Sequence, residues 1–145
     1  MRKKVAFDLD ETIAVALVDS KSLLGFTVRQ GSADLLNELL PIFDLVLWSS
    51  SPRSYVDRAL SSHFGVYFKE SYSWDEMPCR WKDVRMAKVD YLVDDSDHHF
   101  VEARKCNIGP QYIVVPAFGT PEDAVDPLAW TRIVRRRLLA AGGTP

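Results

Sequence analysis

The sequence has few cysteines, no long apolar run and almost no net charge. Its 145 residues include two cysteines, Cys79 and Cys106, which do not form a CxxC pair. Two thiols do not make the disulfide framework of a small secreted domain, so we expect a cytoplasmic protein. No segment reaches the ~18 apolar residues of a membrane span. The apolar run after the basic start is too short for a secretory signal, and we expect no membrane partner.

The formal net charge of −2 argues against a strongly basic nucleic-acid surface and against a polyanionic tail. Nucleic acid is therefore expected only as a possible substrate. Hydrophobic residues make up 47% of the chain and charged residues 26%, which is the profile of a globular protein with an apolar core. The length predicts one domain over residues 1–145, and the sequence contains no repeat or low-complexity tract.

Short apolar segments alternate with segments of helical periodicity. The pattern of buried strands occurs at residues 4–10, 44–48, 66–68, 89–95 and 111–115. The helical pattern occurs at residues 32–43, 51–64, 96–106 and 126–140. Ser32, Ser51 and Asp97 are candidate N-caps. This alternation predicts an α/β fold with a parallel sheet, while residues 12–28 are expected to form a small flap or irregular hairpin and residues 70–88 an irregular segment.

Polar residues follow three of the predicted strands. Asp8 and Asp10 end the first strand, and Ser49 and Ser50 follow the second. Asp94 and Asp95 end the strand predicted at 89–95. Ligands of open α/β sheets bind beyond the carboxyl ends of the strands, so these side chains are expected to converge. Residues i and i+2 of a strand share a face, which lets Asp8 and Asp10 address one substrate. Acids here can also be plain helix caps, but two pairs on separate strands favour a functional site.

Carboxylates gathered at one rim repel one another. Protonation or a bound hard cation can relieve this repulsion. A set of oxygen ligands without a His or Cys pattern favours Mg²⁺ over Zn²⁺, so we expect Mg²⁺ as cofactor. His98 and His99 are expected to be helix-face residues, and Trp48 a core residue.

Four motifs resemble those of the haloacid-dehalogenase-like (HAD) phosphatases, in the same order. FDLDET resembles their DxDxT signature, and LVLWSSS their second motif. Lys82 in RWKDV fits the third motif, and YLVDD the fourth. The stretch VRQGSADLLNELLPIFDLVLWSSSPRSYVDRAL is similar in layout to the NIF-like small phosphatases of the RNA polymerase C-terminal-domain type. Their fourth motif usually reads Asp-Asn-Ser-Pro, whereas Asp94-Asp95-Ser96-Asp97 is more similar to deoxynucleotidases of the same superfamily.

The resemblance implies a three-layer αβα Rossmann-like fold with a central, mainly parallel five-stranded sheet. It also implies a role for each motif residue. Asp8 would be the nucleophile that forms an aspartyl-phosphate, and Asp10 the general acid and base. Ser49 would donate to the phosphoryl oxygens, and Lys82 would offset negative charge. The implied metal ligands are Asp8, Asp10 (through its carbonyl), Asp95 and Asp94. The implied substrate-binding residues are Thr12, Ser49, Ser50 and Lys82.

These roles agree with the chemistry of phosphoryl transfer. A phosphate dianion repels a carboxylate nucleophile, so a cation and a lysine must offset the charge. The leaving alkoxide needs a proton, which a second carboxyl group can give, and the same group can later activate water. The acid at position 10 argues for phosphate esters, because dehalogenases lack it.

The spacing of the motifs leaves no room for a cap domain, since the flap, one helix and one strand fill the segment between Asp8 and Ser49. An open site suits a phosphoprotein, a nucleotide or a small phosphomonoester, the last if a homo-oligomer closes the site. One alternative is a 5′(3′)-nucleotidase or polynucleotide 3′-phosphatase, in which Tyr72, Trp74 and Trp81 would stack on the substrate. A satellite cluster of these aromatics that pins the loop is the favoured interpretation. A non-catalytic module that binds a phosphorylated ligand is a further alternative.

Overall fold

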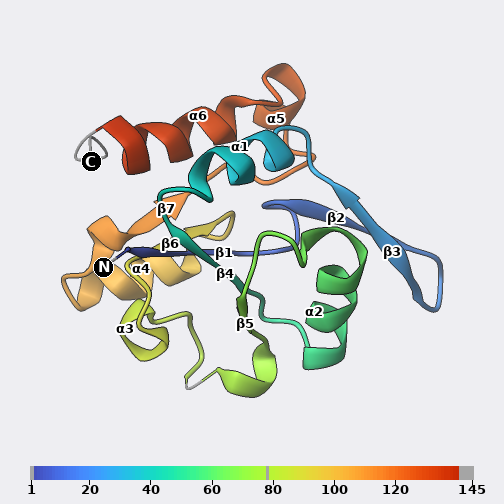
Figure 1. The fold of residues 1–145 in the computed structure, drawn as a ribbon, viewed down its shortest axis with the longest axis horizontal. Helices are drawn as coiled ribbons and strands as arrows, with labels where there is room; N and C mark the ends of the chain where they lie inside the picture. Colours follow the sequence, from blue (N-terminus) through green and yellow to red (C-terminus); the bar gives the residue numbers. More distant parts are fainter. Residues whose placement is uncertain (1, 78, 141–145) are drawn as a thin grey trace.

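The computed structural model describes residues 2–77 and 79–140, and its centre is a five-stranded sheet (Figure 1). The strand order is β5-β4-β1-β6-β7, and every neighbouring pair is parallel. The strands are β1 (Lys4–Phe7), β4 (Asp44–Trp48), β5 (Glu70–Tyr72), β6 (Tyr91–Asp94) and β7 (Tyr112–Val114). The predicted α/β fold with a five-stranded parallel sheet is confirmed.

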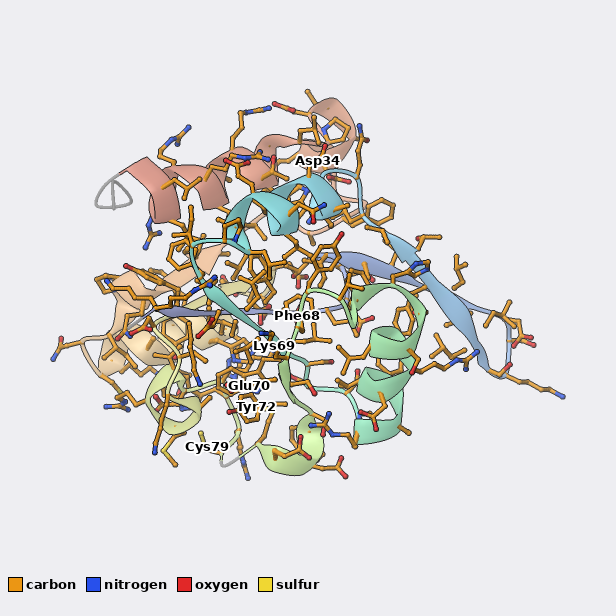
Figure 2. The ribbon with its side chains drawn as sticks, viewed as in Figure 1. Asp34, Phe68, Lys69, Glu70, Tyr72 and Cys79 are labelled. Carbon is orange, nitrogen blue, oxygen red and sulfur yellow. The ribbon has the colours of Figure 1, made fainter. Side chains whose placement is uncertain are left out.

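Helices cover both faces of the sheet (Figures 1 and 2). They are α1 (Ser32–Leu39), α2 (Arg53–Ala59), α3 (Val84–Ala87), α4 (His98–Lys105), α5 (Pro121–Val125) and α6 (Ala129–Arg135). Phe7 of β1 shares one core with Leu36 of α1 and Trp130 of α6. Its neighbour Ala6 faces the other side, where Trp48 packs with α3 and α4. Because successive strand residues alternate between faces, one sheet supports both cores, and the three-layer prediction is confirmed.

A two-stranded antiparallel hairpin, β2 (Ala14–Val18) and β3 (Leu23–Val28), projects beside α2 (Figure 1). The guanidinium of Arg58 donates to the carbonyls of Leu23 and Leu24 at 2.8 and 3.0 Å. The Nε2 atom of His63 lies 2.9 Å from the carbonyl oxygen of Phe26. The predicted flap is therefore a hairpin, with a register shift between Leu17 and Val18, that α2 and the π-helical turn after it (Leu60–Phe64) hold against the domain.

Several boundaries differ from the sequence-based predictions. Residues 66–68 form a turn rather than a strand, because α2 runs on into the π-helical turn and the edge strand starts only at Glu70. The segment 70–88, which was predicted to be irregular, contains that strand, a 3₁₀ turn (Trp74–Glu76) and α3. The remaining short turns are Gly109–Gln111 and Arg136–Ala140. The helix predicted at 126–140 starts at Ala129 as α6 and ends in the π-helical turn at 136–140, and α5 precedes it as a helix that was not predicted.

Two of the three predicted N-caps, Ser32 and Ser51, are wrong, whereas Asp97 does occupy the N-cap position of α4. Gly31 precedes α1 with φ of 89°, a conformation that suits glycine, and a Cβ atom there would lie 2.8 Å from Cγ2 of Thr131. The hydroxyl of Ser32 instead donates to the carbonyl of Ile13 at 2.8 Å. Pro52 takes the N-cap position of α2, and the side chain of Asp97 makes no capping hydrogen bond.

Across residues 2–77 and 79–140 there is no helix with both the length and the apolarity to cross a bilayer.

Candidate active site

The carboxyl ends of the three central strands meet at one pocket. Asp8 follows β1, Ser49 follows β4, and Asp94 ends β6. The amide of Asp8 donates to the carbonyl of Val93 at 2.9 Å, and that of Ser49 to Tyr72 at 3.0 Å, so the sheet ladder fixes both strand tips. The pocket has a volume of about 360 Å³. We call it the acidic pocket; its lining includes Asp8, Asp10, Ser49, Ser50, Lys82, Asp94 and Asp95.

Lys82 is the cation at the floor of the acidic pocket, and its side chain is 1% exposed. Its Nζ atom lies 2.7 Å from Oδ1 of Asp8 and 2.8 Å from Oδ2 of Asp94. Burial lowers the pKa of Lys82, but the two carboxylates outweigh burial and raise the pKa above its ordinary value. The lysine therefore stays charged and joins two strand tips, although it comes from the loop before α3.

Two side chains that sequence reasoning missed hold the backbone of Lys82. The amide of Lys82 donates to Nδ1 of His99 at 3.0 Å, and the hydroxyl of Tyr112 donates to the carbonyl of Lys82 at 2.7 Å. Burial, assisted by the charge of Lys82, lowers the pKa of His99 to about 4. The imidazole is thus neutral at pH 7 and free to accept this bond. His99 is buried on α4 and supports the lysine.

Asp8, Asp94 and Asp95 form a triad of carboxylates. Each offers an oxygen within 4.8 Å of the others. Burial and the nearby Asp8 raise the pKa of Asp95 to about 8. Burial also raises the pKa of Asp94, against the opposing effect of Lys82. One lysine therefore leaves excess negative charge, and the triad has the oxygen donors to hold a divalent hard cation.

Thr12 lies behind this triad and is fully buried. Its hydroxyl is 2.9 Å from Oδ1 of Asp95 and 3.1 Å from Oδ2 of Asp8, and it accepts a hydrogen bond from the amide of Asp95 at 3.1 Å. A hydroxyl has one proton, so Thr12 donates to one carboxylate at a time. Its contacts orient the carboxylates, and Thr12 is not part of the pocket lining where its predicted substrate contact would lie.

Asp10 reaches the pocket from the turn between β1 and β2. Its carboxylate is not part of the triad but accepts a hydrogen bond from the phenol of Tyr55 on α2. Burial raises the pKa of Asp10, and bonds from Tyr55 and Ser51 oppose that rise. The metal contact expected through the carbonyl of Asp10 stays a prediction. Sequence reasoning placed Tyr55 only on the apolar stripe of its helix.

A family model described as NLI interacting factor-like phosphatase matches residues 3–105. The chain belongs to this family. The match includes every strand tip of the acidic pocket, and it confirms the resemblance to the HAD-superfamily, NIF-like phosphatases. None of the curated proteins compared matches the chain.

Several solved structures have a similar fold. Fission yeast RNA polymerase II CTD phosphatase Fcp1 bound to beryllium fluoride has a TM-score of 0.63 at 16% identity, over 81% of this chain and 42% of that one. A second Fcp1 structure has a TM-score of 0.64 at 16% identity, over 99% of this chain and 55% of that one. A predicted HAD-like family hydrolase from Porphyromonas gingivalis has a TM-score of 0.56 at 14% identity, over 88% of this chain and 98% of that one. The chain spans about half the length of the Fcp1 chains.

In this NIF-like family member the pocket lining also includes Arg80, Ser51, Ser96 and His98, which sequence reasoning did not assign to the site. The loop aromatics do not contribute to the lining. Tyr72 packs against Trp48 with ring centroids 5.8 Å apart, and Trp81 against Tyr112 at 6.2 Å. Trp74 is 56% exposed. For Tyr72 and Trp81 the favoured interpretation of internal packing is confirmed.

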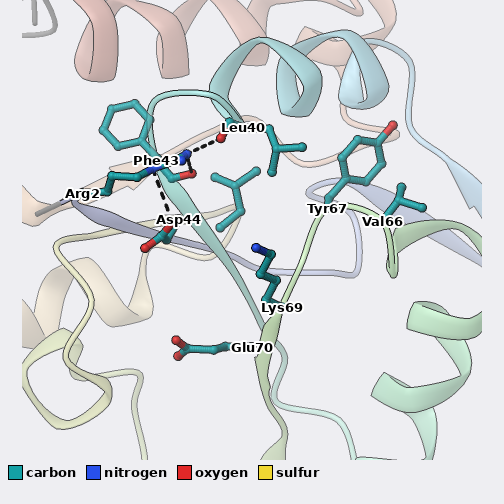
Figure 3. A pocket seen from close by; sticks show the side chains of 9 residues that line it. Arg2, Leu40, Phe43, Asp44, Val66, Tyr67, Lys69 and Glu70 are labelled. Atoms are coloured by element: carbon teal, nitrogen blue, oxygen red, sulfur yellow. Dashed lines mark hydrogen bonds and ion pairs between the residues drawn. The ribbon is translucent and has the colours of Figure 1, made fainter.

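A larger pocket of about 420 Å³ lies at the opposite ends of β4 and β5 (Figure 3). Its two acids have cationic partners there: Arg2 lies 3.4 Å from Asp44, and Lys4 lies 2.7 Å from Glu70. Balanced ion pairs at the surface do not create the charge excess that draws a cation or activates a nucleophile. The chemistry of this NIF-like protein is therefore expected in the smaller, acidic pocket.

Proposed function

We propose that this NIF-like family member is a Mg²⁺-dependent phosphomonoester hydrolase that works through an aspartyl-phosphate on Asp8. The observation that carries this proposal is the position of Asp8. One of its carboxylate oxygens lies 2.7 Å from Nζ of Lys82, and it also shares the triad with Asp94 and Asp95. A carboxylate needs nearby positive charge, here from Lys82 and from a cation held by the triad, before a phosphate dianion can approach it.

The residues of the acidic pocket suit a reaction in two steps. First, a carboxylate oxygen of Asp8 bonds to phosphorus, the ester P–O bond breaks, and Asp10 gives its proton to the leaving oxygen. Then a water molecule attacks phosphorus and passes a proton to Asp10, which releases phosphate and restores Asp8. Burial raises the pKa of Asp10 and so favours the protonated form that the first step requires.

Lys82 and Ser49 are placed to balance charge during these steps. Lys82 keeps Asp8 oriented and offsets negative charge on the transferred phosphoryl group, while Ser49 lines the pocket as a hydroxyl donor. Asp8, Asp94 and Asp95 would hold Mg²⁺, which would supply the further positive charge that the phosphate dianion needs. Thr12 keeps two of these carboxylates in place.

The elements between Asp8 and Ser49 are the hairpin, α1 and β4, which supports the expected open site. An open pocket suits a phosphorylated protein segment, and Fcp1 is described as a phosphatase of the RNA polymerase II CTD. Tyr72 and Trp81 pack internally, so these two rings do not support the stacking that the alternative nucleotidase or polynucleotide 3′-phosphatase would use. The cytoplasmic location and the single domain over residues 1–145 stay predictions.

Activity is expected to depend on Mg²⁺. The protein in Mg²⁺ should hydrolyse p-nitrophenyl phosphate and a phosphoserine peptide, EDTA should abolish turnover, and added Mg²⁺ should restore it. Phosphate release measured for peptides, nucleotides and 3′-phosphorylated oligonucleotides ranks the substrate classes. Absence of hydrolysis for the whole panel in Mg²⁺, with tight binding of a phosphopeptide, would show a non-catalytic binding module instead.

The stabilisation by Mg²⁺ is expected to increase with pH. The folded pKa of Asp95, about 8, lies above the unfolded value of about 3.9. The metal-free protein therefore loses stability as pH rises between these values, because ionised Asp95 is unfavourable there. A cation binds the ionised form, so the increase in Tm caused by Mg²⁺ should be larger at pH 8.5 than at pH 6.

Thermal unfolding with and without Mg²⁺ at several pH values measures this effect. The low pKa of His99 acts in the opposite direction below pH 6.5, but equally with and without metal, so it cancels in the difference. Asp95→Asn is the matched variant, in which the pH dependence of the Mg²⁺ effect should largely disappear. A Mg²⁺ effect of the same size at every pH in the unaltered protein would contradict the assignment.

A further inference from the structure

Tyr55 joins the hairpin to the acidic pocket. It lies in the first turn of α2, the helix beside the hairpin in Figure 1, and its phenol donates to Oδ1 of Asp10. The two residues are 45 positions apart in the sequence. Tyr55 itself is not part of the pocket lining, whereas Asp10 is. Its hydroxyl therefore acts on Asp10 rather than on a bound substrate.

Packing fixes the ring that carries this hydroxyl. The ring of Tyr55 meets Phe26 of β3 edge-on, with centroids 5.1 Å apart and an interplanar angle of 82°. Phe26 is 4% exposed, and its carbonyl contacts His63 at 2.9 Å. Arg58, on the same helix as Tyr55, holds the other end of β3. A side chain locked in this way presents its donor in one place, at little entropic cost when the bond forms.

We propose that Tyr55 is a positioning residue that fixes the carboxyl group of Asp10 for proton transfer to the leaving group. The proposal rests on the proposed function, in which Asp10 is the general acid. A carboxyl group has two oxygens, and the phenol engages Oδ1. The proton that Asp10 delivers is then carried on Oδ2, and rotation of the carboxyl away from the pocket is prevented.

The phenol itself exchanges no proton in either step. When the Asp8–phosphorus bond forms and the ester bond breaks, the proton on Oδ2 goes to the leaving oxygen. When water attacks, Oδ2 takes a proton from it. Oδ1 accepts the hydrogen bond of Tyr55 in both protonation states, because a protonated carboxyl keeps its other oxygen as an acceptor. Tyr55 thus contributes orientation, and its effect should scale with the need for proton transfer.

Leaving-group dependence tests this role. Tyr55→Phe keeps the ring and its packing on Phe26 but removes the donor. A p-nitrophenolate leaving group departs without much help, whereas phenolate and the alkoxide of phosphoserine need the proton. The kcat/KM of Tyr55→Phe for phenyl phosphate and for a phosphoserine peptide should fall about tenfold or more beyond any fall for p-nitrophenyl phosphate. This ratio reports the first step, in which the leaving group departs, whereas the second step is the same for every ester. Tyr67→Phe, which removes a phenol at the opposite pocket, should show no such difference.

Further variants separate the possible results. Asp10→Asn should show the same leaving-group pattern more strongly. If Asp10→Asn shows no leaving-group dependence, Asp10 is not the general acid, and the proposal falls together with that part of the proposed function. If Asp10→Asn shows it and the kcat/KM of Tyr55→Phe falls equally for all three esters, or does not fall, only the role of Tyr55 is overturned. Phe26→Leu, which keeps the phenol but weakens the packing of its ring, gives a second test. The same leaving-group dependence of kcat/KM with a smaller magnitude supports the proposal, and an equal loss of kcat/KM for all three esters opposes it.

Discussion

Asp8→Asn is expected to lower kcat for p-nitrophenyl phosphate by about 10⁴-fold or more, which is the size of effect seen when a nucleophile is removed. The amide keeps the shape of the carboxylate but is a poor nucleophile, and it cannot form the acyl-phosphate. Lys82 would retain its contact with Asp94 at 2.8 Å, and one of three crowded carboxylates would lose its charge. The variant should therefore stay folded, with a Tm no lower than that of the unaltered protein.

Steady-state kinetics in Mg²⁺, with thermal unfolding of the same samples, measure both parts of this prediction. Asp34→Asn is the matched control, because Asp34 is an exposed residue in the first turn of α1 (Figure 2) and does not line the acidic pocket. It should have full activity. Acid quenching during turnover followed by peptide mass analysis should find phosphate on the peptide that contains Asp8. If Asp8→Asn turns over p-nitrophenyl phosphate at the rate of the control, an aspartyl-phosphate on Asp8 is ruled out.

The part of the site that could be predicted from the sequence is the part set by strand ends. Asp8, Ser49 and Asp94 each follow or end an apolar strand, and in a parallel sheet that local pattern is enough to bring them to one edge. Lys82 could be placed only by resemblance, because it precedes a four-residue helix in a segment without periodicity. Its assignment to the site depended on the order of the motifs.

The residues that support the site could not be found in this way. His99 and Tyr112 contact the backbone of Lys82 from 17 and 30 positions away, and Tyr55 reaches Asp10 from another helix. In the sequence each of them fits the pattern of an ordinary helix or strand residue. Only the tertiary packing brings its polar atom to a partner. The wrong strand at 66–68 has a similar cause, because the π-helical turn after α2 displaces a short edge strand that periodicity alone does not define.

Lys82→Met tests whether the same lysine supports both activity and the fold. Methionine approximates the length of the lysine stem but leaves Asp8 and Asp94 without their shared cation. Loss of charge stabilisation in the pocket should reduce kcat about 10²- to 10³-fold. Removing one partner of a buried ion pair typically costs about 3–5 kcal/mol of unfolding free energy, so a large loss of stability is also expected at pH 8.

The pH dependence of that loss has a definite sign. Without Lys82 the folded pKa of Asp94 should move further upward, away from the unfolded value of about 3.9, because Lys82 opposes the rise that burial causes. Stability of the variant should then fall as pH rises above about 4, so urea unfolding should show a smaller deficit at pH 5.5 than at pH 8. Mg²⁺ should recover part of the deficit at pH 8 by balancing the same carboxylates, without restoring kcat. Lys69→Met, in the lining of the opposite pocket, is the control and should behave like the unaltered protein. If Lys82→Met is as stable as the unaltered protein at pH 8, the contacts of Lys82 at 2.7 and 2.8 Å do not stabilise the fold.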